Sequence, residues 1–178
     1  MKTATEMADF CKENNTGSGT SKKWTKKHFG VVEKQLKPNE EVLFAFVGLF
    51  NYVSTTNHES NYAIAITNER IIACQKKMMG ENVKIILRRN LNDITKSTGM
   101  IFGILTIDTI KETFNVATNK QEIDVIHEGI NNILFADEEV KEGKTQSVVE
   151  QLKEFKELLD MEIITQEEFN QKKAEILG

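Results

Sequence analysis

The sequence contains two cysteines, one proline and no long apolar run. Cys11 and Cys74 lie 63 positions apart, which excludes a CxxC motif, a paired zinc spacing and a disulfide framework. Cys74 sits in an apolar run typical of a buried strand, so both cysteines are expected to be free thiols. No segment approaches the roughly 20 apolar residues that span a bilayer, and the N-terminus lacks the apolar run of a signal peptide. We therefore expect a cytoplasmic protein.

Motifs for catalysis and metal binding are also missing. The sequence has no phosphate-cradling glycine loop, no HExxH and no GxSxG. His28, His58 and His127 are far apart in the sequence, and His127 lies in an apolar helical stripe that favours a structural role. The sequence thus predicts no enzyme, no metal site and no cofactor.

The composition that is present is that of an ordinary globular protein. The chain has 178 residues, of which 39% are hydrophobic and 28% are charged. This is enough for one domain with its own core and a small appendage. Twenty-three basic and 27 acidic side chains give a net charge of −4, so the whole molecule has no broad attraction for nucleic acid or anionic membrane. A site for such a partner must be local.

The N-terminal part divides into two segments. Residues 1–21 are small and polar, so we predict a mobile lead-in with at most one helical turn near residues 4–12. Residues 22–37 place apolar side chains at helical spacing before Pro38, which predicts a helix. Its basic side chains have two interpretations. They form a site for an anionic partner, or they solvate the outer face of a packed helix, which is the commoner arrangement. The residues of this candidate site are Lys22, Lys23, Trp24, Lys26 and Lys27.

The middle of the chain has the period of β-strands. Residues 61–76 place large and small side chains on alternate faces around a polar tetrad, which predicts a central hairpin packed on both sides. Residues 41–51 are apolar on both faces, and Gly48 there predicts a bend or bulge. Further strands are predicted at residues 83–89, 91–95, 100–107 and 112–118. About seven short strands at this spacing are typical of a sandwich or barrel.

Residues 119–136 return to the helical period. An isoleucine stripe predicts an amphipathic helix that covers the sheet, with Asn119 as N-cap and Glu122 three residues later. Residues 137–145 are a charged linker.

Residues 146–178 predict a two-helix hairpin whose second helix opens with a capping box at residues 165–168. Such a small hairpin cannot build a core of normal stability, so its apolar stripe is expected to need a partner surface. The residues predicted to mediate oligomerisation or docking are Leu152, Phe155, Leu159, Ile164, Phe169, Ile176 and Leu177.

Two parts of the sequence resemble known families. Residues 24–136, through the hairpin AIAITNERIIAC and the segment LNDI, resemble bacterial pleckstrin-homology (PH) domains of the YokE-like kind. That resemblance implies a mainly β fold with α, a seven-stranded antiparallel barrel or sandwich capped by one C-terminal helix. The tail, through IITQEEF and KKA, resembles the SHOCT module, a short C-terminal two-helix domain, with Glu162 where that family usually has glycine. Together with the composition, they predict a flexible N-terminal segment (1–21), a PH-like domain with an N-terminal helix (22–136), a linker (137–145) and a SHOCT helical hairpin (146–178).

The resemblances imply binding rather than catalysis. Phosphoinositide-binding PH domains resemble one another in a basic loop between the first two strands, and residues 51–60 here contain no lysine or arginine. We therefore do not expect this chain to bind a phosphoinositide at that place. Basic pairs at residues 76–77 and 88–89 are typical of solvated strand ends.

Two functions remain as hypotheses. The first is a non-catalytic interaction module in which the PH-like domain binds a protein or peptide, and the tail mediates self-association or docking. The second is a peripheral adaptor that binds an anionic membrane or nucleic acid through residues 22–27. Residues 1–37 contain eight lysines against four acidic residues, and residues 146–178 contain four lysines against eight. This asymmetry permits an anionic partner at the N-terminus or head-to-tail pairing of the two ends.

Overall fold

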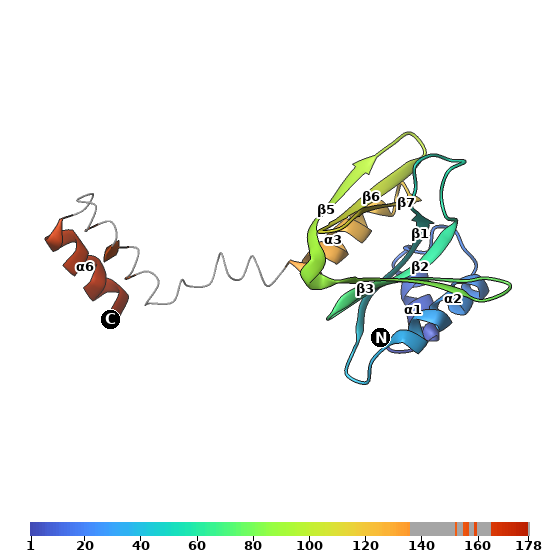
Figure 1. The fold of residues 1–178 in the computed structure, drawn as a ribbon, viewed down its shortest axis with the longest axis horizontal. Helices are drawn as coiled ribbons and strands as arrows, with labels where there is room; N and C mark the ends of the chain where they lie inside the picture. Colours follow the sequence, from blue (N-terminus) through green and yellow to red (C-terminus); the bar gives the residue numbers. More distant parts are fainter. Residues whose placement is uncertain (136–151, 153–154, 157–158, 160–164, 178) are drawn as a thin grey trace. The chain divides into compact units, whose positions relative to one another are not determined.

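The computed structural model describes residues 1–135, 152, 155–156, 159 and 165–177. The chain forms two compact units, Met1–Leu134 and Phe135–Gly178. The first unit is built on a seven-stranded antiparallel sheet with strand order β4-β3-β2-β1-β7-β6-β5 (Figure 1). This confirms the predicted fold class, mainly β with α. The strands are β1 (Val42–Phe50), β2 (Asn61–Thr67), β3 (Arg70–Lys76), β4 (Glu81–Leu87), β5 (Leu91–Thr98), β6 (Phe102–Thr109) and β7 (Thr113–Asn119), with a 3₁₀ turn at Arg88–Asn90.

The N-terminal segment is structured, and the prediction of a mobile lead-in is wrong. Helix α1 (Ala4–Glu13) begins at a Thr3–Glu6 capping box and packs against α2 (Lys22–Gln35). Both helices also contact the sheet. The buried side chains of α1 form one stripe at helical spacing, namely Ala4, Met7, Ala8 and Cys11. These buried side chains hold the segment on the domain, although residues 1–21 are mostly polar in composition.

Residues 16–18 continue this attachment by bonding to β1. The backbone N–H of Val47 donates to the carbonyl of Thr16 at 2.8 Å, and the Ser18 hydroxyl donates to the carbonyl of Val47 at 2.7 Å. The register of β1 with β7 contains only Leu49 and Phe50. The N-terminal segment therefore satisfies backbone groups of β1 that β7 does not reach.

The central hairpin is packed on both faces, as predicted. Ala63, Ala65 and Cys74 belong to a buried cluster with side chains of α1 and α2. Tyr62 lies on the opposite face and stacks on Phe50, with ring centroids 4.9 Å apart. Small side chains on one face allow the helices to approach the sheet closely, and large ones fill the other face.

Gly48 has a different role from the predicted bend. The β1–β2 register runs without a shift from Phe44 to Leu49, and the only irregularity in β1 is between Val42 and Phe44. A Cβ at Gly48 would lie 2.4 Å from the side chain of Val116. Gly48 therefore allows β7 to approach β1.

Helix α3 (Ile123–Leu134) covers part of the sheet and packs against β5, β1 and β6 (Figure 1). Its buried stripe is Ile123, Ile126, Ile130 and Leu134, as the isoleucine periodicity predicts. The helix begins at Ile123, later than predicted, and the Glu122 carboxylate also has partners outside the helix start. It accepts hydrogen bonds from the backbone N–H and the hydroxyl of Ser18, at 3.0 and 3.3 Å. This bond joins the N-terminal segment to the start of α3.

The second unit contains α6 (Gln166–Leu177). Its predicted capping box is present, since the N–H of Glu168 donates to the Thr165 hydroxyl at 3.3 Å and the N–H of Thr165 donates to the Glu168 carboxylate at 2.8 Å. Leu152, Phe155, Leu159 and Phe169 are helical and half-buried. Ile164, Glu162, the linker and the side chains of Ile176 and Leu177 lie outside the described residues.

Candidate functional site

A basic pocket of about 450 Å³ lies between α2 and the turn that joins β3 to β4. Helix α2 contributes Trp24, Lys27 and His28, and the strand end and turn contribute Lys76 and Lys77. The remaining lining residues are Ser60, Asn61, Gln75 and Met78. Among the described lining residues, three are lysines and none is acidic. The pocket therefore favours an anionic group.

Trp24 and His28 form one wall of this pocket. Their rings stack with centroids 3.7 Å apart, and His28 Nδ1 accepts a hydrogen bond of 3.0 Å from the N–H of Lys76. Burial, with a smaller contribution from Lys27, lowers the pKa of His28 to about 4. The imidazole is therefore neutral near pH 7, with its proton on Nε2 because Nδ1 is an acceptor. This bond ties α2 to the end of β3.

The lysines differ in how far other side chains neutralise them. Lys76 Nζ lies 3.0 Å from the Glu81 carboxylate, which also accepts from Lys34 at 2.8 Å. In the described part of the chain, Lys27 and Lys77 have no carboxylate within ion-pair distance. The nearby Glu59 has a lowered pKa, chiefly because it accepts from Tyr62, with a small effect of Lys77. Lys27 and Lys77 are thus the cations most available to a ligand.

The structure brings together only part of the predicted basic site. Trp24 and Lys27 line the basic pocket, while Lys22 pairs with Asp9 and lines a separate pocket of about 270 Å³ near α1. Lys23 and Lys26 are exposed on α2. Sequence reasoning treated residues 76–77 as a solvated strand end and missed that they face Trp24. His28 and Lys76 are 48 positions apart, so no local pattern links them.

In the other basic pair, Arg88 has a structural partner. The Arg88 guanidinium donates to the carbonyl of Leu134, the last residue of α3, at 2.5 Å. A cation at a helix C-terminus satisfies a carbonyl that has no partner within the helix. Arg88 therefore holds the end of α3 rather than contributing to the basic pocket.

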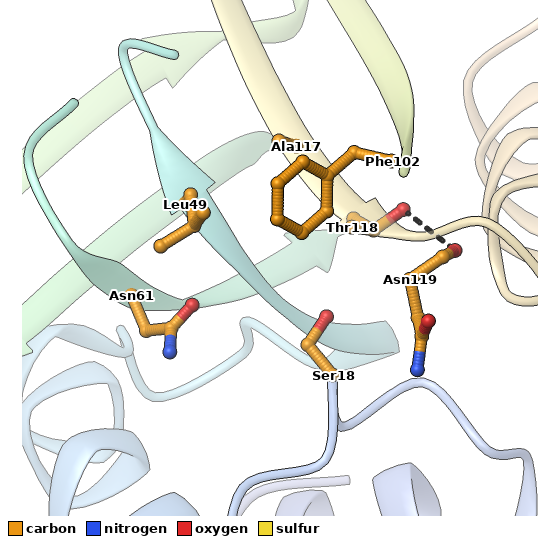
Figure 2. Close-up of a pocket in the computed structure, with 7 residues that line it drawn as sticks. All are labelled: Ser18, Leu49, Asn61, Phe102, Ala117, Thr118 and Asn119. Carbon is orange, nitrogen blue, oxygen red and sulfur yellow. Dashed lines mark hydrogen bonds between the residues drawn. The ribbon is translucent and has the colours of Figure 1, made fainter. Parts of the chain in front are cut away.

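A second, uncharged pocket of about 220 Å³ shares the lining residue Asn61 with the first. Figure 2 shows the residues that line this second pocket. Leu49, Phe102 and Ala117 give it an apolar side. Ser18, Thr118 and Asn119 give it a polar side (Figure 2). The two pockets together combine positive charge, side-chain amides and the aromatic rings of Trp24 and Phe102.

The described residues contain no cluster of three or more metal-ligating side chains and no helix long and apolar enough to cross a bilayer. Both cysteines are buried, and burial raises the pKa of each thiol to about 12. At neutral pH these are protonated thiols inside the fold, which suits packing rather than nucleophilic chemistry.

Two protein-family models match the chain. A family model described as a bacterial PH domain matches residues 36–132, more than half of the chain. The chain belongs to this family. The match supports the broad resemblance seen in the sequence and does not single out the YokE-like kind. A second model, the short C-terminal domain SHOCT, matches residues 150–177 of this bacterial PH domain protein, as its tail sequence predicts.

Two solved structures are similar to the PH domain protein at low identity. One is the C-terminal domain of an unknown protein from Leishmania infantum, with 16% identity, a TM-score of 0.43, and coverage of 61% of this chain and 93% of the other. The other is the Vps36 N-terminal PH domain, with 18% identity, a TM-score of 0.42, and coverage of 56% and 85%. No curated protein matches the chain. Both matched families are typically non-catalytic, which agrees with a binding module.

Proposed function

We propose that this protein is a non-catalytic adaptor. Its PH domain binds a protein partner, and its SHOCT tail assembles copies of the chain or docks them on another protein. The observation that supports the binding role is the basic pocket, where Trp24, Lys27 and Lys77 meet from separate elements. Tryptophan is enriched among the residues that contribute most to binding at protein interfaces, and the neighbouring lysines would attract a partner of opposite charge.

The tail supports the assembly role through its apolar side chains. Leu152, Phe155, Leu159 and Phe169 retain partial exposure in the described part of the tail. A two-helix hairpin of this size buries too little apolar surface for normal stability. Contact with a second copy would remove this surface from water and stabilise the helices.

Light scattering coupled to size exclusion tests the assembly role. The full chain is compared with a truncated protein that ends at Glu142 and with the full-length double variant Phe155→Ser, Phe169→Ser. We expect a multimer for the full chain and a monomer for both variants. Gln171→Ser, an exposed change on the same tail, is the matched control and should keep the multimer. The same number of copies per particle for the full and the truncated chain would reject assembly through the tail.

A second candidate function is binding to an anionic surface through residues 22–27. It is favoured by the exposure of Lys23, Lys26 and Lys27 on α2 and by Met78, which is 98% exposed at the rim of the basic pocket. An exposed methionine beside lysines suits the boundary between lipid headgroups and acyl chains. Sedimentation with phosphatidylserine vesicles tests it. Binding that is lost in high salt and in Lys23→Glu, Lys26→Glu would favour this function over the first.

A further inference from the structure

The two pockets lie along one row of residues that crosses the sheet. Asn61 of β2 pairs with Leu49 of β1, and Leu49 pairs with Ala117 of β7. The β2–β3 register ends at Ala63 opposite Cys74, and two more residues would place Asn61 opposite Lys76. Neighbouring strands are about 4.8 Å apart, so the row from β3 to β7 spans roughly 14 Å. That distance matches about four or five residues of an extended peptide.

The row lies on the same face of the sheet as α1 and α2, next to the part of that face that the two helices cover. Leu49 and Asn61 alternate in phase with Val47 and Ala63, which pack against the helices. Trp24 of α2 and Ser18 of the N-terminal segment therefore border the row on the helix side. The sheet thus forms the floor of the row, and the N-terminal layer forms one wall.

The chemistry changes from one end of the row to the other. Lys27 and Lys77 provide cations at the β3 end, while Leu49 and Phe102 provide apolar surface at the β7 end. Between them lies Asn61, whose side-chain amide can both donate and accept. An extended backbone has donors and acceptors that need such partners when it leaves water.

We propose that the two pockets form a single site for an extended, acidic peptide segment of a protein partner. One or two carboxylates bind at Lys27 and Lys77, the peptide backbone lies against Asn61, and an apolar side chain enters the pocket of Leu49 and Phe102. This inference deepens the proposed adaptor function by naming the class of ligand and its direction.

A peptide fits these observations better than a lipid surface or nucleic acid. The apolar and amide side of the row carries no charge among its described lining residues. A flat anionic surface would use the lysines and leave this second pocket empty.

Trp24 gives a direct readout, because it is the only tryptophan in the chain and lines the basic pocket. The full chain is titrated with a capped peptide that has two adjacent glutamates, a glycine–serine spacer of about four residues and one leucine. We expect a saturable change in Trp24 emission. A peptide with lysines in place of the glutamates should bind at least about tenfold more weakly. A peptide with serine in place of the leucine should also bind more weakly.

Two variants with the same net charge separate site from charge. Lys27→Glu, Lys77→Glu should abolish the response, while Lys12→Glu, Lys111→Glu should keep it, since neither control residue lines either proposed pocket. Phe102→Ala should remove the preference for leucine and retain that for glutamate. Circular dichroism melting checks that each variant is folded.

Three outcomes would overturn the inference. They are no response to any acidic peptide, an equal loss in both charge variants, or binding to phosphatidylserine vesicles that depends on Lys27 and Lys77 while the peptides fail. In the last case an anionic surface is the ligand. The molar mass of the full chain is independent of all three, so failure of the peptide site is distinguishable from failure of assembly through the tail.

Discussion

The helices nearest the two chain ends begin alike and are packed differently. Both α1 and α6 open with a reciprocal capping box, Thr3 with Glu6 and Thr165 with Glu168. Helix α1 then buries four side chains against α2 and the sheet. In α6, every side chain described from Gln166 to Ala174 is exposed except that of half-buried Phe169. A cap determines where a helix begins, and contacts elsewhere determine whether the fold depends on it.

The largest predicted effect comes from removing each end. Deletion of residues 1–20 removes the Met7 and Cys11 contacts and the bonds of Thr16 and Ser18 to β1. The loss of these contacts should cost several kcal/mol, which is comparable to a typical net stability of about 5–15 kcal/mol. We therefore expect the deletion variant to show no cooperative unfolding transition. Truncation after Glu142 should leave the melting temperature of the PH domain unchanged. Thermal unfolding followed by circular dichroism measures both, and a folded N-terminal deletion would contradict the comparison.

This contrast also shows why the sequence misled at the N-terminus. The stripe Ala4, Met7, Ala8 and Cys11 is regular, but its side chains are small or flexible and stand among polar neighbours. The Thr3–Glu6 capping box is the local sequence signal that marks the start of this helix. The bonds from residues 16–18 to β1 have no local signature, because they depend on where β1 separates from β7.

The second prediction concerns how the helical layer is held to the sheet. Arg70 donates to both oxygens of Glu40 at 2.7 Å and to the carbonyl of Gln35, near the end of α2. Although desolvation opposes it, hydrogen bonds from Arg70, Lys37 and Thr67 lower the pKa of Glu40 to about 2. Arg70→Met would leave this buried carboxylate without its cation and should cost about 3–5 kcal/mol in urea unfolding.

Two variants check this interpretation. The double variant Glu40→Leu, Arg70→Met should recover part of the loss, because no buried charge remains. Lys37→Ala breaks an exposed ion pair with Glu69 and should change stability little. A loss in Lys37→Ala as large as that in Arg70→Met would show that burial of the pair is not the cause.

The third prediction compares one apolar side chain from each end. Met7 is fully buried, so Met7→Ala should lower the free energy of unfolding of the PH domain by about 2–4 kcal/mol. Phe169→Ala, in the tail, should leave that free energy unchanged and reduce only assembly. Denaturant titration measures the first effect and light scattering the second. Destabilisation of the PH domain by Phe169→Ala would mean that the two ends are energetically coupled.

The fourth prediction uses pH to test the Trp24–His28 wall. The folded pKa of His28 is about 4 and its ordinary value is 6.5, so the unfolded chain binds the proton more readily between these values. Stability should therefore fall by about 2 kcal/mol between about pH 7 and pH 5. Glu40 adds a loss only below its ordinary value of 4.5, whereas Glu122, whose pKa burial raises, opposes the trend above 4.5.

The variant His28→Gln should flatten this profile, because glutamine can still accept from the N–H of Lys76 and does not titrate. The same change at His58, a half-buried histidine in the loop between β1 and β2, is the control and should keep the slope. An unchanged slope in His28→Gln would show that other groups govern the acid response.

The sheet and the tail were predictable, and the basic pocket was not. Alternating large and small side chains at residues 62–66 identify a strand packed on both faces, and the isoleucine stripe identifies α3. These signals lie within one element and have a fixed period. The pocket depends on α2 crossing the end of β3, which brings Trp24 and Lys27 to Lys76 and Lys77. A periodic pattern within one element cannot indicate that two elements far apart in the sequence cross each other.

The smallest predicted effect returns to the two capping boxes, where the chemistry is matched. Thr3→Ala and Thr165→Ala each remove a hydroxyl that accepts a backbone N–H, at 3.2 Å from Glu6 and 3.3 Å from Glu168. Each loss is about 1 kcal/mol of helix stability. Because α1 is part of the core, Thr3→Ala should lower the global melting temperature. Thr165→Ala should instead accelerate amide exchange within residues 166–170 alone.

The neighbouring changes Thr5→Ala and Gln166→Ala keep both boxes and serve as controls, since alanine favours a helix at either position. If Thr165→Ala also lowered the global melting temperature, α6 would be contributing to the stability of the PH domain. If Thr3→Ala affected only local exchange, α1 would unfold independently of the sheet. Either result would remove the distinction between an end that the fold requires and an end that is available for a partner.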